Sequence, residues 1–133
     1  MNEEERLAWS LDQLKWSLQA LALPYDAQRS LFPAFACTAD ELALDFDHWC
    51  ETASHQHSFT ADQLSALASV SEVLSAMTDE KDADLWSDSA LAHLPRWQDV
   101  RDRARKALAA FQWNLDVPPS DRAVFVPSWP EKS

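Results

Sequence analysis

Residues of types that bind metals or carry out catalysis are frequent between positions 37 and 57, among them Cys37, Asp45, Asp47, His48, Cys50, His55 and His57. Zinc is held by such residues, but only where the side chains converge as a tetrahedron. If residues 38–53 form a helix, Cys37 and Cys50 lie about 20 Å apart, too far to share a metal ion or a disulfide bond. His48 and Cys50 then point to different sides of that helix. We therefore expect no metal site and no cofactor.

Catalytic motifs that depend on glycine are excluded, because the chain contains no glycine. Phosphate-binding loops, dinucleotide fingerprints and nucleophile elbows all need that residue. A carboxylate pair could still act as general acid and base among the many acidic residues. Asp45 is the first candidate, since its spacing of four from Trp49 places both on one helix face. An ordinary hydrogen bond at the edge of the core is the expected role of Asp45, and an enzyme with carboxylate chemistry stays an alternative.

Acidic residues form two clusters that favour a binding function. The first lies within residues 40–51 and the second within residues 79–88. Asp47 and Glu51 are four apart, and like charges at this spacing destabilise a helix by a few tenths of a kcal/mol. Folding gains nothing from this arrangement, whereas a basic partner would be attracted by it. The predicted partner-binding residues are Asp45, Asp47, His48, Glu51, Asp82 and Asp84. The alternative is that these acids only keep the protein soluble.

The charge balance restricts the partner. The formal net charge is −11, although Arg96, Arg101, Arg103, Arg105 and Lys106 lie close together. Such a field repels nucleic acid and anionic membranes, so we expect neither as a partner and a basic protein instead. The basic stretch is expected to pair with acids of the helix at 38–53 or of the 79–84 loop. No apolar run approaches the ~20 residues that span a bilayer, and the acidic N-terminus is unlike a signal peptide, which favours the cytoplasm.

The elements that position these residues are predicted to be all α. Capping boxes at Asn2/Glu5, Thr38/Glu41 and Thr60/Gln63 predict helix starts, and Pro95 suits the first turn of another helix. Four main helices follow: 3–23, 38–53, one from Thr60 through Met77, and one from Pro95 to Phe111. With short helices after Pro24 and around 89–94, they form a compact bundle. Residues 1–133 are read as one domain, with a helical body at 1–113 and an extended, proline-rich tail at 114–133.

The helix at 3–23 carries two apolar stripes. Leu7, Leu11, Leu14, Leu18 and Leu21 form a seam that we expect to pack on the bundle. Trp9, Trp16 and Leu23 recur every seven residues on the opposite side. We predict that the tail, which contains Val124, Phe125 and Trp129, packs on this second stripe. A homodimer seam and a protein partner are the alternatives for the same surface.

Size, charge and helical character together resemble the small acidic all-α immunity proteins of bacterial toxin–immunity systems. The segments that carry this resemblance are "ADELALDFDHWCE" and "TDEKDADLWSD". It implies one-to-one binding that blocks a basic nuclease or other toxin domain, with carboxylates in place of phosphates. A homodimeric scaffold, such as a secretion chaperone or effector adaptor, is the alternative.

Overall fold

The computed structural model describes residues 2–119, and every regular element in that range is helical. The elements are α1 (Glu3–Ala22), α2 (Tyr25–Ser30), α3 (Thr38–Gln56), α4 (Ala61–Asp79), the 3-10 helix η1 (Ala83–Trp86), α5 (Asp88–His93) and α6 (Pro95–Ala110). This confirms the all-α prediction, with α1, α3, α4 and α6 as the four main helices. None of the described helices is both long enough and apolar enough to cross a membrane.

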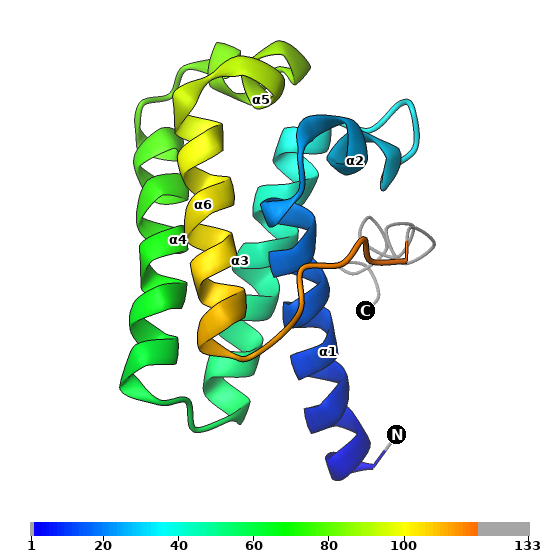
Figure 1. Ribbon diagram of the computed structural model, residues 1–133, viewed down its shortest axis with the longest axis vertical. Helices are drawn as coiled ribbons and strands as arrows, with labels where there is room; N and C mark the ends of the chain where they lie inside the picture. Colours follow the sequence, from blue (N-terminus) through cyan, green and yellow to red (C-terminus); the bar gives the residue numbers. More distant parts are fainter. Residues whose placement is uncertain (1, 120–133) are drawn as a thin grey trace.

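The main helices pack in the order α3, α1, α6 and α4 (Figure 1). α1 packs against both α3 and α6, and α4 packs against α6, whereas α3 and α4 touch only sparsely. The shorter elements α2, η1 and α5 gather at one end of the bundle (Figure 1). The side of the bundle between α3 and α4 is therefore its most open side.

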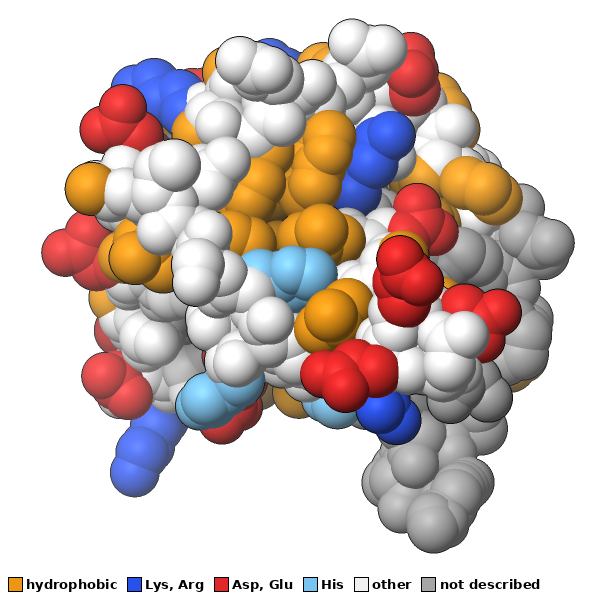
Figure 2. Space-filling model, turned by 90° about the horizontal axis from the view of Figure 1, so that it is seen from below, with side chains coloured by type: hydrophobic (Ala, Val, Ile, Leu, Met, Phe, Trp, Pro, Cys, Tyr) orange, Lys and Arg blue, Asp and Glu red, His pale blue; other side chains and the backbone are white. Residues whose placement is uncertain are grey.

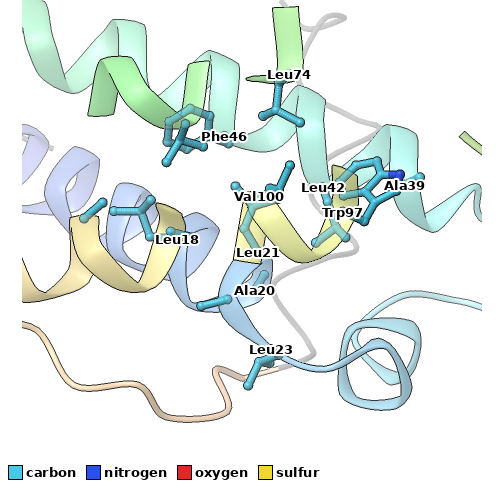
Figure 3. Packing of buried hydrophobic residues seen from close by; sticks show 14 of the residues in the cluster. Leu18, Ala20, Leu21, Leu23, Ala39, Leu42, Phe46, Leu74, Trp97 and Val100 are labelled. Carbon is cyan, nitrogen blue, oxygen red and sulfur yellow. The ribbon is translucent and has the colours of Figure 1, made fainter. Parts of the chain in front are cut away.

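The core contains the leucine seam of α1. Leu14, Leu18 and Leu21 are fully buried, and Leu7 and Leu11 are half-buried toward the outer end of the helix. Figure 3 shows side chains from α1, α3, α4 and α6 meeting in this core. Trp97 is also fully buried, with its indole N–H donating to the carbonyl of Leu85 at 2.8 Å. The seam packs on the bundle as predicted.

The C-terminal end of α1 is closed by side chains from α2 and α6. The last carbonyls of a helix have no partner within it, and glycine-based caps are not open to this chain. Gln28 Nε2 donates to the carbonyls of residues 20 and 21, at 3.1 and 3.0 Å. Arg105 Nε donates to the carbonyl of residue 22 at 3.2 Å, and Arg101 Nε to that of residue 23 at 2.9 Å. The first and last helices are thereby tied together.

Arg101 does more than cap α1. Its Nη2 also donates to Gln28 Oε1 at 2.8 Å and to the carbonyl of Leu91 in α5 at 2.6 Å. The side chain is buried, and burial together with the nearby Arg105 lowers its pKa. A guanidinium stays charged in proteins, so the carbonyl dipoles around it must compensate for lost water. Arg101 joins four helices at one point.

The other basic residues follow the sequence prediction in part. Arg96 pairs with Glu80 in the 79–84 region, as expected. Arg103 pairs instead with Glu72 of α4 at 3.3 Å and with Asp99 of its own helix at 3.0 Å. Within residues 2–119, none of the ion pairs joins α6 to α3.

Two of the three predicted capping boxes are present. Asn2 with Glu5 and Thr60 with Gln63 make both reciprocal hydrogen bonds. The box at Thr38 is wrong: α3 has Cys37 at its N-cap, and no side chain caps it. Thr38 is instead the first helical residue, and its fully buried side chain makes no cap hydrogen bond.

The second stripe of α1 is covered in part by the chain itself. Trp16 and Leu23 are buried, and Trp9 remains 45% exposed. The indole N–H of Trp16 donates to the carbonyl of Pro119 at 2.7 Å, and Gln19 Nε2 donates to that of Asn114 at 2.9 Å. Residues 114–119 therefore lie against α1. The predicted contacts of Val124, Phe125 and Trp129 fall outside the described residues.

Candidate functional site

A groove of about 490 Å³ lies on the open side of the bundle, between α3 and α4. We call it the α3–α4 groove. Its floor is apolar, because Phe46 and Leu74 are buried beneath it. Its rim carries three carboxylates, and Leu44 on the α3 wall is 58% exposed. The groove is lined by Asp40, Ala43, Leu44, Phe46, Asp47, Ser71, Leu74, Ser75, Thr78, Asp79 and Trp86.

Local contacts position Trp86 in the lining of the groove. Trp86, the last residue of η1, packs edge-on against Trp97 with ring centroids 5.5 Å apart. Its carbonyl accepts a hydrogen bond from the Cys37 thiol at 3.6 Å. Further along α3, the Cys50 side chain is half-buried, and burial raises the pKa of its thiol.

The charges of the groove are all of one sign. Its lining includes Asp40, Asp47 and Asp79 and contains no Lys, Arg or His. Within residues 2–119, no ion pair involves any of these three carboxylates. The nearby Glu41 has its pKa raised, first by burial and then by the charge of Asp40. The rim is thus a site of uncompensated negative charge.

The structure separates the four residues predicted on α3. Asp47 lies in the groove, and Glu51 is exposed one turn further on. The Asp45 side chain is only 2% exposed. Because Asp45 is two positions from Asp47, it lies on another side of the helix and is not part of the groove. His48 lies edge-on against Trp49 with ring centroids 4.5 Å apart. Burial lowers the pKa of His48, although the negative charges of Glu51 and Asp47 act in the opposite direction.

Asp82 and Asp84 lie beyond the end of α4 and are exposed. Asp82 is the N-cap of η1, where its carboxylate accepts a hydrogen bond from the backbone N–H of Asp84 at 3.0 Å. Neither residue lines the groove, although Asp79 just before them does. Their observed role is to start the short helix that carries Trp86.

Sequence reasoning missed the α4 wall of the groove. Ser71, Ser75 and Thr78 belong to it, and their hydroxyl side chains were not considered as part of a site. The available signal was their recurrence at helical spacing on one side of α4. Asp40 and Asp79 were recognised as acidic but not as neighbours of one groove.

The predicted absence of a metal site concerned the histidines and cysteines of α3. His57 Nε2 lies 3.0 Å from the carbonyl of Leu7 and 3.3 Å from Ser10 Oγ, which joins α1 to the end of α3. His55 Nδ1 lies 2.9 Å from the carbonyl of Glu51. Within the described part of the chain, no three His, Cys, Asp or Glu side chains are placed to hold a metal ion together.

A second apolar surface lies at the end of the bundle where α1 begins. Figure 2 shows hydrophobic side chains near the centre of this face, with a histidine beside them and acidic side chains around the edge. Phe59 packs edge-on against Phe111 with ring centroids 5.1 Å apart, and Phe111 stacks on Trp113 with ring centroids 4.4 Å apart. Leu64 is 47% exposed. These rings close the end of the bundle, and we do not assign them a ligand.

Comparisons with known proteins give no further guide to the site. No protein-family model, curated protein or solved structure matches the chain.

Proposed function

We propose that the protein is an acidic binding module that captures a basic protein partner at the α3–α4 groove, in the manner of an immunity protein that blocks a toxin or effector domain. One observation carries the proposal: an apolar floor is bordered by Asp40, Asp47 and Asp79, with no cation in the lining. Protein interfaces of this kind use the apolar centre for affinity and the charged rim for orientation and rate.

The rest of the chain supports a role for the rim charges outside folding. Three of the described arginines are engaged elsewhere, with Arg96 on Glu80, Arg103 on Glu72 and Arg101 buried among carbonyls. Three carboxylates around one groove make the local electrostatic potential more negative, and Lys or Arg side chains of a partner neutralise this charge. The partner would gain rate from long-range attraction and affinity from the floor.

A homodimer built on the tryptophan stripe finds less support. Trp16 and Leu23 are buried within the chain, so only Trp9 of that stripe offers a large exposed surface. Trp9 already packs edge-on against Trp49, with ring centroids 5.0 Å apart. The groove combines an apolar floor with a charge pattern that selects its partner.

The test is co-expression with the product of the neighbouring gene, which is the expected partner of an immunity-type inhibitor. We expect a one-to-one complex by size exclusion and relief of any growth defect that the neighbouring product causes. Asp47→Lys should lower the association rate constant by about tenfold or more at low salt, and the loss should shrink at high salt.

The matched control for this charge reversal is Asp12→Lys, which makes the same change at an exposed position of α1 outside the groove. It should leave the association rate within about twofold of that of the unaltered protein. Equal effects of the two substitutions would assign the attraction to net charge alone. Undiminished binding by Asp47→Lys would overturn the proposed site.

A further inference from the structure

The two walls of the α3–α4 groove share one spacing pattern. Apart from Phe46 on the floor and Asp79 at the end of α4, the α3 wall is formed by positions 40, 43, 44 and 47, and the α4 wall by positions 71, 74, 75 and 78. Each set follows i, i+3, i+4, i+7, which is the stripe that a helix presents to another helix. Two antiparallel helices that show such stripes to a common hollow, and touch each other sparsely, leave room for a third helix.

The dimensions of the groove suit a short helical segment. Seven residues of α3 rise about 10 Å, or about two turns, so two or three anchor side chains of a helix fit along it. Ala43, Ser71 and Ser75 are small and let a helix backbone come close. The Thr78 hydroxyl already donates to the carbonyl of Leu74 at 3.0 Å and does not need a partner.

An extended segment is a poorer occupant than a helix. Extended peptides gain affinity by pairing their backbone N–H and C=O groups with a free sheet edge. The walls here are helices whose mid-helix backbone groups are bonded internally, so an extended peptide would bury unpaired backbone groups. A helix brings its own backbone hydrogen bonds and needs only side-chain contacts.

We infer that the partner's binding element is an amphipathic α-helix with an apolar stripe bordered by Lys or Arg. The apolar stripe contacts Leu44, Leu74 and Trp86, and the cations face Asp40, Asp47 and Asp79. This inference rests on the proposed function, because it names the part of the basic partner that enters the same groove.

The probe is a stapled helical peptide of about three turns, with Leu at i, i+3 and i+7 and Lys on both sides of that stripe. A second stapled peptide has the same composition but alternates Leu and Lys, so that no apolar face forms. We expect the amphipathic peptide to bind at least about tenfold more tightly and to shift the amide resonances of the groove residues in the labelled protein.

Filling the groove provides the decisive variant. Ser75→Tyr places a large side chain on the α4 wall, and Ser65→Tyr makes the same change at an exposed α4 position outside the groove. Both serines are exposed, so both variants should keep the helical circular dichroism of the unaltered protein. Ser75→Tyr should lower the affinity for the amphipathic peptide by at least about tenfold, and Ser65→Tyr should leave that affinity unchanged. Equal binding of the two peptides, or undiminished binding by Ser75→Tyr, would overturn the inference.

The outcomes also distinguish this inference from the proposed function. If Asp47→Lys weakens binding of the neighbouring gene product but Ser75→Tyr does not, the partner is basic and contacts the rim without inserting a helix. If the amphipathic peptide binds the groove but the neighbouring product forms no complex, the helix-binding groove stands and the immunity-type function is wrong.

Discussion

Replacing Arg101 by methionine should destabilise the protein severely although no binding surface is altered. Methionine keeps most of the volume of the side chain and removes its donors. The three acceptors that lose their donor are the carbonyls of Leu23 and Leu91 and the Oε1 atom of Gln28. All three lie where Arg101 is buried, and the side chain of Gln28 is fully buried too.

The magnitude follows from the unsatisfied acceptors. Each buried acceptor left without a donor costs about 1–3 kcal/mol, and part of this is recovered because a buried guanidinium no longer has to be desolvated. The lowered pKa of Arg101 has the same cause, burial first and Arg105 second. A net loss of about 3 kcal/mol is expected, which is a large share of the 5–15 kcal/mol typical of a domain.

The assay is urea unfolding followed by circular dichroism, with the slope of the transition checked for two-state behaviour. Arg105→Met is the matched control. Its side chain is 44% exposed, and it makes one hydrogen bond of 3.2 Å to Ala22 and an exposed ion pair with Asp102, so its loss should cost less than about 1 kcal/mol. If the unfolding free energy of Arg101→Met lies within about 1 kcal/mol of that of the unaltered protein, with an equal slope of the transition, the capping of α1 by Arg101 does not stabilise the fold and the reasoning is refuted.

Two further predictions concern the backbone and pH. Gln112 follows the C-cap of α6 with a φ of 60°, a left-handed conformation that favours glycine. Gln112→Gly should stabilise the protein by about 0.5–1 kcal/mol in urea unfolding, whereas Lys106→Gly inside α6 should destabilise it by about 1 kcal/mol; equal losses would contradict this account. Burial, and secondly the charge of Asp40, raises the pKa of Glu41 in the folded state. The contribution of Glu41 to folding stability is therefore fully present below the usual carboxyl pKa and is lost as the pH rises through the raised pKa. Glu41→Gln should therefore raise the unfolding free energy at neutral pH and leave it unchanged at acidic pH, and an equal gain at both pH values would exclude the titration of Glu41 as the cause.

Features that depend on neighbours in sequence could be predicted. The capping boxes at Asn2 and Thr60 need only a hydroxyl or amide and a Glu or Gln three residues later, and both formed. Thr38 and Glu41 have the same spacing, but the Thr38 side chain is fully buried and α3 begins one residue earlier than that box requires. Tertiary burial therefore outweighed a local motif.

Features that depend on distant residues could not be predicted. Arg101 was expected to find a carboxylate, whereas its described partners are carbonyl oxygens, among them Leu23, which is 78 positions away in the sequence. The groove could not be seen either, because Asp47 and Asp79 meet only through the way α3 and α4 pack around α1 and α6. Helical periodicity shows which side of a helix is apolar, but it does not show whether another helix of the chain will cover that side.

The position of α1 in the bundle divides this helix into two levels of local stability. Its first two turns are largely exposed, and they contact the rest of the bundle through His57, which lies beside Leu7 and Ser10, and through Trp49, which packs against Trp9. Its second half is almost wholly buried and ends where Gln28, Arg101 and Arg105 bind its carbonyls. The outer turns can fray without disturbing the core, while the inner turns open only when the helices around them separate. Amide protons along this single helix therefore exchange with solvent by two routes, local fraying before His57's contacts and cooperative unfolding beyond them.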